Sequence, residues 1–289
     1  MLPVCVVLPL QHKPLISVVI PTFNRVDALP RSIYSVLRQT YRNFELIVVD
    51  DGSTDATSDL LASIPELIQF VKQPHRGVSA ARNAGISVSR GDLIAFLDSD
   101  DEWREDKLEK QLRLFSHENE YFICHSDELW LKHGQIVNQK NVHRKQGGYF
   151  FERALDRCLI SPSSVLISRT LLAKVGRFDE DLPAAEDYDL WLRVTAFYPV
   201  NFVSEPLIIK YGDRNDQLSK TIPAIDRYRV QSILKILQDP RLPENYRKAA
   251  EKTLVKKCEI LAKGLEKRGK NEEATRYHDI ADKYKSSQY

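Results

Sequence analysis

The sequence predicts an α/β fold with a mostly parallel central sheet flanked by helices, followed by a helical C-terminal region. In the first hundred residues, apolar runs of strand length alternate with segments of helical periodicity, which is typical of consecutive βαβ units. Of the 289 residues, 43% are hydrophobic, so the chain can bury a large core. From about residue 225 onward, Lys, Arg, Glu and Leu predominate, and the apolar residues recur at helical spacing.

The first four strands are expected to alternate with three helices. Asp27 is the expected N-cap of the first helix, and Ser53 or Thr54 that of the second. The third helix is predicted within a loop and helix over residues 77–89. The four strands are predicted at residues 16–20, 45–50, 68–73 and 92–98.

The order of elements after the fourth strand is less regular. A charged helix is expected from Glu102 to about Phe115, and Pro206 is expected to interrupt an extended segment over residues 200–211. The remaining elements are strands at 121–131 and 163–169, a helix at 184–197, and three or more helices after residue 225.

The chain is expected to divide into an extension, one α/β domain and the helical region. The predicted ranges are 1–14 for the extension, 15–222 for the α/β domain, with its two halves at about 15–101 and 102–222, and 223–289 for the helical region.

Charge and cysteine content exclude several classes of function. The 42 Lys and Arg nearly balance the 40 Asp and Glu, so no global positive field favours nucleic acid as a partner. The four cysteines lie far apart without a CxxC pair, which argues against a disulfide framework or a zinc site and fits a cytoplasmic protein. The apolar N-terminal segment is too short to cross a bilayer, which takes about 20 apolar residues.

Two predicted strands end in clustered carboxylates. "VVDDGSTD" places Asp50 and Asp51 after the second strand, and "FLDSDDEW" places Asp98, Asp100 and Asp101 after the fourth. Ligands of open α/β sheets bind beyond the carboxyl ends of the strands. Because like charges repel, a bound divalent cation would explain both clusters. The alternative is that each cluster only caps the helix that follows it.

A third segment, "GVSAARNAG", opens the predicted third helix. Gly77 permits a tight turn and Ser79 is a candidate cap, while Arg82 and nearby backbone N–H groups would suit a diphosphate. The alternative is that Arg82 is an ordinary surface residue.

The chain resembles family 2 glycosyltransferases of the GT-A fold. The segments "VVIPTFNR", "YRNFELIVVDDGSTD", "HRGVSAARNAG", "GDLIAFLDSDD" and "AEDYDLWLR" carry the resemblance in this order, over about residues 16–219. The resemblance implies an inverting enzyme that transfers a sugar from a nucleoside diphosphate sugar, most often of UDP, to a hydroxyl of a glycan or lipid-linked acceptor. It also implies a divalent metal, Mn²⁺ or Mg²⁺, and a place in cell-surface polysaccharide synthesis.

The same resemblance assigns donor-site roles to individual residues. Asp98 and Asp100 match the DxD motif and would hold the metal, while Asp51 would accept a hydrogen bond from the base and Asp50 would support the loop. The nucleotide-binding residues that it implies are Pro21, Thr22, Asp51, Arg82, Asp98 and Ser99.

On the acceptor side, the resemblance makes Asp187 the general base and gives Glu186 a positioning role. Asp189 is the second choice. Without the other motifs, the same segment reads as acidic first-turn residues on a helix with a buried face.

Three further residues are candidate acceptor or loop contacts. Trp103 either forms the floor of the acceptor site or packs in the core. Asp101 is either an additional carboxylate of the site or a helix cap. Arg214 lies where related enzymes have a loop that closes on the diphosphate, although this segment lacks a histidine. "SPSS", residues 161–164, either lines the donor-sugar pocket or forms a polar turn.

Rival functions remain open at this point. The main alternative is a catalytically silent GT-A-fold protein that binds nucleotide sugars or assembles a complex. A nucleotidyltransferase or a dehydrogenase would need a glycine-rich loop after the first strand, and "PTFNRVD" has no glycine. The helical region suits packing on the catalytic domain, homo-oligomer formation, or peripheral contact with the inner face of a membrane.

Overall fold

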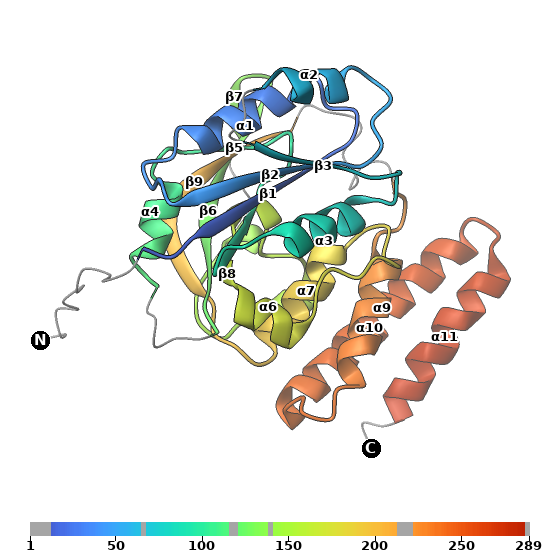
Figure 1. Ribbon diagram of the computed structural model, residues 1–289. Coiled ribbons are helices and arrows are strands. Elements are labelled where there is room, and N and C mark those ends of the chain that lie inside the picture. The colour runs from blue at the N-terminus through green and yellow to red at the C-terminus, as the bar shows by residue number, and fades with distance from the viewer. Residues whose placement is uncertain (1–12, 65–67, 116–120, 138–140, 213–221, 287–289) are drawn as a thin grey trace, which may run out of the picture. The chain divides into compact units, whose positions relative to one another are not determined.

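The computed structural model describes residues 13–64, 68–115, 121–137, 141–212 and 222–286 (Figure 1). The chain divides into two compact units, each assembled from separate stretches of sequence. The first unit contains Met1–Asn138, Pro162–Lys174 and Asn201–Gly212, and the second contains Gln139–Ser161, Val175–Val200 and Asp213–Tyr289.

The first unit contains a mixed sheet in the order β3-β2-β1-β4-β8-β6-β9-β5, with β7 paired to β6. The pairs β1–β2, β1–β4, β2–β3 and β6–β9 are parallel, and β8 runs antiparallel to β4 and β6. The predicted α/β fold and its parallel first half are therefore confirmed. The strands are β1 Ile16–Thr22, β2 Phe44–Asp50, β3 Ile68–Lys72, β4 Leu93–Phe96, β5 Glu102–Trp103, β6 Ile123–Lys132, β7 Gln135–Val137, β8 Leu166–Ser168 and β9 Asn201–Tyr211.

Helices cover both faces of the β3-β2-β1-β4 part of this sheet, with α1 and α2 on one face and α3 on the other (Figure 1). Because side chains alternate along a strand, Val18 faces the core cluster that contains Ile33 of α1. Val19 faces α3 instead, where a Cβ atom on Gly85 would lie 2.4 Å from the Val19 side chain. The helices are α1 Leu29–Leu37, α2 Thr57–Ser63, α3 Val78–Val88, α4 Lys107–Leu112 and α6 Arg169–Val175.

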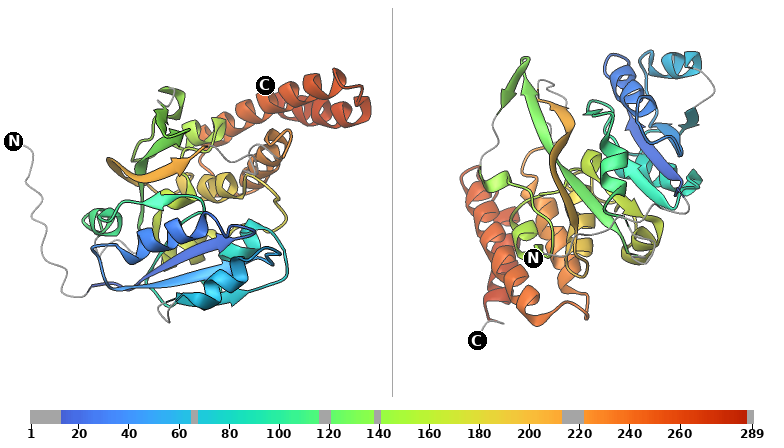
Figure 2. Two further views of the ribbon diagram at one scale, coloured as in Figure 1. Left: turned by 90° about the horizontal axis from the view of Figure 1, so that it is seen from above. Right: turned by 90° about the vertical axis from the view of Figure 1, so that its left-hand side faces the viewer.

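The second unit is mainly helical. Its helices are α5 Phe151–Asp156, α7 Glu186–Thr195, α9 Asp226–Leu237, α10 Glu244–Glu266 and α11 Asn271–Ser286. The last three confirm the predicted helical C-terminal region, and α10 and α11 lie side by side (Figure 2). Leu254, Cys258 and Leu265 form the predicted apolar stripe of α10 and are buried. Of the helices in the described part of the chain, none is both long enough and apolar enough to span a bilayer.

The predicted helix caps are wrong, because a loop contact replaces them. Helix α1 follows Ala28 and α2 follows Ala56, and neither has a side-chain cap, so Asp27, Ser53 and Thr54 do not cap them. Instead, Ser53 Oγ accepts a hydrogen bond from the backbone N–H of Asn24 at 2.9 Å, and the Thr54 N–H donates to Asn24 Oδ1 at 2.8 Å. Nor does Ser79 cap α3, because it lies inside that helix, after Gly77.

The predicted helix from Glu102 to Phe115 is also wrong in its first part. Glu102–Trp103 pairs with β9 as strand β5, and α4 begins only at Lys107. The Trp103 indole donates to the carbonyl of Ser163 at 2.8 Å, which favours the strand position over the first turn of a helix.

Pro206 does not interrupt β9. It pairs with Asp127 of β6, where shifts in the pairing absorb the irregularity. The sequence did not reveal β7, α5 or α6. The described segments also contain 3₁₀ turns at Asn141–His143 and Pro162–Ser164.

The side-chain amine of Lys107 is buried in the core of the first unit. Its Nζ donates to Gln111 Oε1 at 2.6 Å and lies 4.0 Å from the centre of the Trp103 ring. Burial lowers the pKa of Lys107 from 10.5 to about 7. A charged Lys107 therefore costs folding free energy below this pKa.

Stability is expected to increase with pH as Lys107 loses its proton. Above pH 7 the unfolded chain, with its ordinary pKa of 10.5, binds more protons than the folded chain. The free energy of unfolding should rise by about 2 kcal/mol between neutral pH and about pH 9. Urea denaturation at both pH values measures this change, and Lys107→Met should flatten it. An equal rise in Lys107→Met would assign the effect to another group.

Candidate active site

The carboxyl ends of β1, β2 and β4 lie at one edge of the parallel part of the sheet. Thr22 pairs with Asp50 at the ends of β1 and β2, and Val19 pairs with Phe96 at the end of β4. The acidic segments that follow β2 and β4 therefore start from the same edge.

Asp50 stabilises the loop that follows β2. Its carboxylate is fully buried and accepts hydrogen bonds from the Ser53 N–H at 2.9 Å and the Ser58 hydroxyl at 2.6 Å. These bonds fix the turn that leads into α2.

Asp51 fixes a second loop, which leads into α3. Its side chain accepts hydrogen bonds from Gln73 Nε2 at 2.6 Å, from the Gly77 N–H at 2.8 Å and from the Arg76 N–H at 3.0 Å. His75 Nδ1 lies 2.8 Å from the same carboxylate. The Asp51 carboxylate thus already has four partners in the loop. A nucleotide base that donates a hydrogen bond to Asp51 would have to share its oxygens with these partners.

Asp51 also positions an aromatic pair that the sequence did not reveal. The His75 ring stacks on the ring of Phe23, with the centroids 4.1 Å apart. Phe23 directly follows β1 and keeps 37% of its surface exposed. A Cβ on Gly52, which has a φ of 81°, would lie 2.8 Å from the backbone nitrogen of His75, so this close approach requires glycine. The only sequence signal was an aromatic residue at a strand end.

Asp98 lies between two cations at the end of β4. Arg82 of α3 donates from Nη2 to Asp98 Oδ1 at 2.8 Å, and Lys210 Nζ lies 4.0 Å from Asp98 Oδ2. Burial alone would raise the pKa of Asp98, but Arg82 and Lys210 hold it below its ordinary value. About a quarter of the Asp98 side chain remains exposed, at 25%. The carboxylate is therefore charged and reachable by a ligand.

Asp101 is the buried member of the cluster. Ser163 donates from Oγ to its carboxylate at 2.6 Å, and Lys210 Nζ lies at 3.0 Å. Burial raises the pKa of Asp101 to about 7, helped by the charges of Asp98 and Asp100 and opposed by Lys210. These contacts differ from those of a helix cap, because the Asp101 carboxylate accepts a hydrogen bond from a serine 62 positions away.

Lys210 is the main residue of this cluster that the sequence did not reveal. It lies on β9, more than 100 positions from Asp98, and no motif marks it. Burial alone would lower the pKa of Lys210, but the neighbouring carboxylates, Asp101 first among them, raise it. The amine therefore remains protonated and offsets part of the negative charge of the cluster.

Asp98 and Asp100 fit the oxygen ligands that Mg²⁺ and Mn²⁺ prefer. Burial, and then the charge of Asp98, raise the pKa of Asp100, so a cation at this place would relieve the repulsion. No group of three or more His, Cys, Asp or Glu side chains in the described ranges is arranged to hold a metal ion. Two carboxylates are nevertheless enough where a substrate diphosphate supplies further oxygens.

The other predicted site residues that the structure describes, on the donor side and at the candidate acceptor contact Trp103, are buried. Pro21 and Thr22 end β1 and are buried, and Ser99 is 7% exposed. Trp103 is 2% exposed and belongs to the core cluster, which agrees with the packing alternative. Arg214 lies outside the described residues.

Asp187 and Glu186 belong to the second unit, at the start of α7. The residue before them, Ala185, adopts the left-handed conformation with a φ of 60°, which is costly for a side chain with a Cβ. The Cys158 thiol lies 3.2 Å from Asp187 Oδ2, and the Tyr188 N–H donates to Oδ1 at 2.7 Å. Asp187 is half-buried and Glu186 is buried.

Asp189, the second choice for the base, is held in ion pairs. It is 1% exposed and lies 2.8 Å from both Arg193 Nη2 and Lys235 Nζ. No cation of the described part of the chain lies within 4 Å of the Asp187 carboxylate. Of the two residues, only Asp187 therefore has a carboxylate that is not neutralised.

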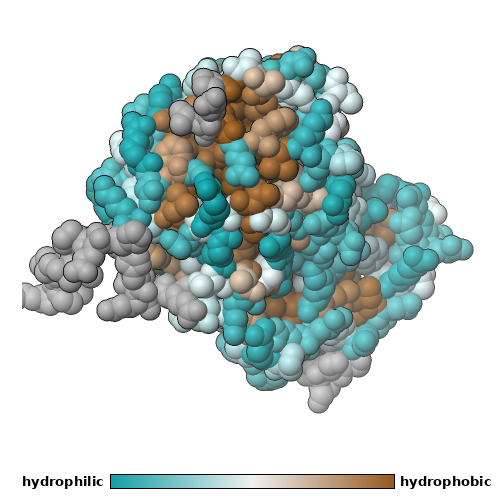
Figure 3. Space-filling view, viewed as in Figure 1, coloured by the Kyte–Doolittle hydropathy of each residue, from teal (hydrophilic) through white to brown (hydrophobic). Residues whose placement is uncertain are grey.

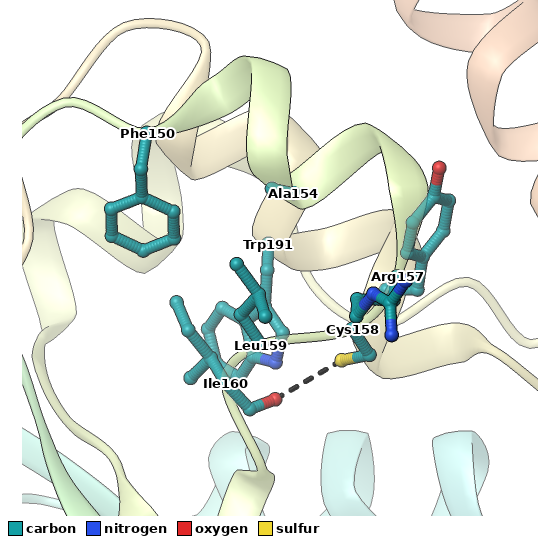
Figure 4. A pocket seen from close by; sticks show the side chains of 8 residues that line it. Phe150, Ala154, Arg157, Cys158, Leu159, Ile160 and Trp191 are labelled. Atoms are coloured by element: carbon teal, nitrogen blue, oxygen red, sulfur yellow. Dashed lines mark hydrogen bonds between the residues drawn. The ribbon is translucent and has the colours of Figure 1, made fainter. Parts of the chain in front are cut away.

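A narrow hollow with no free room for a water molecule lies beside Cys158 (Figure 4). Cys158 donates to the carbonyl of Ile160 at 3.1 Å, and burial together with the charge of Asp187 raises the pKa of its thiol well above the ordinary value. Cys158 is thus protonated, and its single S–H is shared between the Ile160 carbonyl and the Asp187 carboxylate. The lining residues are Phe150, Ala154, Arg157, Cys158, Leu159, Ile160, Tyr188 and Trp191.

The model of the family described as Glycosyl transferase family 2 matches residues 17–175 of the chain. The chain belongs to glycosyl transferase family 2. This membership confirms the family that the five segments predicted. The matched range includes the acidic segments after β2 and β4, whereas Asp187 lies beyond it.

Curated glycosyltransferases align with about two thirds of the chain. An uncharacterized glycosyltransferase of Rickettsia felis is 33% identical over 204 residues, with 68% of this chain and 33% of that protein covered. The Bacillus subtilis protein TuaG, named for teichuronic acid biosynthesis, is 33% identical over 184 residues, covering 62% of this chain and 71% of TuaG. The Escherichia coli protein WfgD is 34% identical over 182 residues, covering 62% of this chain and 69% of WfgD. The chain thus spans about a third of the R. felis relative.

Solved structures show the same fold at low sequence identity. TarS 1–349 from S. aureus in complex with UDP has a TM-score of 0.64 and 18% identity, covering 95% of this chain and 92% of that chain. The Pyrobaculum calidifontis mannosyltransferase PcManGT, in complex with GDP-Man and Mn²⁺, has a TM-score of 0.61 and 17% identity, covering 96% of this chain and 89% of that chain. The predicted GT-A fold is confirmed.

Proposed function

We propose that the chain is an inverting glycosyltransferase that transfers a sugar from a nucleoside diphosphate sugar, with a UDP-sugar favoured, to a hydroxyl group of a glycan or lipid-linked acceptor. The observation that carries the proposal is the acidic cluster after β4, in which Asp98 lies between Arg82 and Lys210. Such an arrangement offers carboxylates to a cation and positive charge to phosphates at one place.

The relatives support the choice of donor and setting. The name of WfgD describes glucosyl transfer from UDP-Glc to a diphosphoundecaprenol-linked GlcNAc, and TuaG is named for teichuronic acid biosynthesis. From these names we infer that this chain acts in cell-surface polysaccharide synthesis at the cytoplasmic side of a membrane.

In the proposed mechanism, Asp98 and Asp100 would hold a divalent cation, Mn²⁺ or Mg²⁺. When bound, this ion would stabilise the charge that develops on the leaving diphosphate. Arg82 binds a phosphate oxygen while it still balances Asp98. The backbone at Pro21 and Thr22 and the carboxylate of Asp51 contact the base, and Ser99 contacts the nucleotide.

Asp187 is proposed as the general base. It takes the proton of the acceptor hydroxyl while the hydroxyl oxygen bonds to the anomeric carbon and the bond from that carbon to the diphosphate breaks. Attack from the face opposite the diphosphate inverts the configuration. Cys158 orients the carboxylate, and Glu186 helps to position the substrates.

Nucleotide binding tests the proposal directly. Thermal unfolding should be followed with UDP, GDP, CDP and dTDP, each with and without Mn²⁺. UDP with Mn²⁺ is expected to raise the unfolding temperature most, because a ligand at 100 times its Kd stabilises the folded state by about 2.7 kcal/mol. If no nucleotide stabilises the chain in the presence of metal, the donor site is assigned wrongly.

The main alternative is a protein that binds nucleotide sugars without transferring the sugar. The half-buried Asp187, free of ion pairs among the described residues, favours the enzyme. Release of free nucleotide from a panel of sugar nucleotides, with an acceptor glycan present, separates the two functions. A protein that binds the donor but releases no nucleotide would support the alternative.

A further inference from the structure

Helix α10 carries four lysines on one outward face. Lys252, Lys256, Lys263 and Lys267 are exposed, and within the described ranges none has a carboxylate within 4 Å. At 100° per residue they lie within an arc of about 60°, and at 1.5 Å per residue they extend over about 22 Å. We call these four residues the lysine stripe.

The acidic residues of α10 that flank the lysine stripe point to α11. Glu259 lies 2.9 Å from Lys285 Nζ, and Glu266 lies 2.8 Å from His278 Nε2. Both carboxylates are thus held by partners on α11, although the charge of Lys263 also acts on Glu259. Positive charge therefore predominates on the outward face of α10.

One exposed apolar residue borders the lysine stripe. Ile260 lies between Lys256 and Lys263 along the helix, about 20° beyond the arc of the four lysines, and is 56% exposed. It also lines an open hollow of about 490 Å³, together with Leu261, Gly264 and Arg268 of α10 and residues 222–226. Elsewhere, the visible surface of α10 and α11 is mostly hydrophilic (Figure 3).

We propose that the lysine stripe binds the surface of an anionic membrane, with the ammonium groups against lipid phosphates and Ile260 at the boundary of the headgroups. An anionic bilayer attracts clustered lysines, and an exposed apolar side chain on the same helix face adds hydrophobic contact. Nucleic acid fits less well, because the stripe has no aromatic or arginine side chain for stacking. This inference does not depend on the proposed donor or acceptor.

Vesicle co-sedimentation of the full chain tests the proposal. The probes are phosphatidylcholine vesicles with and without phosphatidylglycerol, at low and high salt. We expect binding at least tenfold stronger to the anionic vesicles, decreasing with salt. Equal binding to both vesicle types, or no binding, would overturn the proposal.

A quadruple variant with all four lysines of the stripe changed to Gln should lower the binding by at least tenfold, since one lysine near an anionic surface contributes about fivefold. The matched control changes Lys132, Lys174, Lys270 and Lys283 to Gln, which alters net charge equally but leaves the stripe intact. The control should bind like the parent. Similar losses in both variants would mean that net charge, not the stripe, drives the binding.

Two further measurements separate membrane binding from other effects. Ile260→Ser should reduce the binding that persists at high salt, because this residue contributes the apolar contact. The quadruple variant should unfold at the temperature of the parent, since Gln and Lys have similar helix propensities. If the parent binds a DNA oligonucleotide as strongly as anionic vesicles, the stripe is a general polyanion site and the membrane assignment is wrong.

Discussion

Replacing Asp187 with Asn is expected to lower the rate of sugar transfer by about 10² to 10⁴-fold, the usual contribution of a general base. Asn has the same shape, and its carbonyl oxygen can still accept the hydrogen bond from the Tyr188 N–H, while its NH₂ group replaces the oxygen that faces the Cys158 thiol; it cannot take a proton at neutral pH. The position of α7 should therefore be unchanged. Turnover of donor and acceptor at saturating concentrations measures the loss, and calorimetry with nucleotide and Mn²⁺ checks that donor binding remains.

Two variants control for indirect effects at this site. Asp181→Asn makes the same chemical change at an exposed position of the second unit and should leave the rate unaltered. Cys158→Ser keeps a hydrogen-bond donor beside Asp187 and should retain most of the activity. Unchanged turnover in Asp187→Asn would remove this residue as the base, whereas a parallel loss of donor binding would point to a structural role.

The sequence predicted most of the fold because its signals were periodic. Continuous apolar runs of strand length identified β1 to β4, and apolar residues at helical spacing identified α1 to α3 and the three C-terminal helices. The helix starts could not be predicted, because the cap of a helix depends on the local competition for hydrogen bonds. Asn24, about 30 positions away, binds the segment that was expected to cap α2.

Short elements escaped prediction for a related reason. Strand β5 has two residues, and its conformation follows from pairing with β9 about 100 positions later and from the bond between Trp103 and Ser163. A segment of two residues is too short to show an apolar periodicity. Because charged residues surround it, the sequence pattern predicted the start of a helix instead. Tertiary contacts decided its conformation.

The acidic residues of the candidate site could be predicted from the sequence, but only one of its two cationic residues could. Arg82 lies in a recognisable segment, whereas Lys210 reaches Asp101 from a strand that carries no motif. Similarly, the choice between Asp187 and Asp189 needed coordinates, because the partners of Asp189 include Lys235 on another helix. A sequence shows which groups are charged, while the distances that balance them emerge only after folding.

Changing Asp100 to Asn is expected to lower the affinity for nucleotide in the presence of Mn²⁺ by at least about tenfold, since even outer partners of metal ligands contribute 10 to 100-fold. The change should not harm the fold. The raised pKa of Asp100 means that its charge is disfavoured by burial and by Asp98, so a neutral side chain relieves repulsion at neutral pH. The free energy of unfolding without metal should stay equal or rise.

Metal dependence distinguishes this effect from a simple loss of nucleotide binding. With Arg82 and Lys210 still in place, metal-free nucleotide should bind the variant at least as well as the parent, because one negative charge has been removed near the phosphates. Calorimetric titration of UDP with and without Mn²⁺ gives both affinities. Asp92→Asn, just before the opposite end of β4, is the matched control and should keep the full metal effect. If Asp100→Asn keeps it too, Asp100 does not hold the ion, and the positive side chains alone must bind the diphosphate.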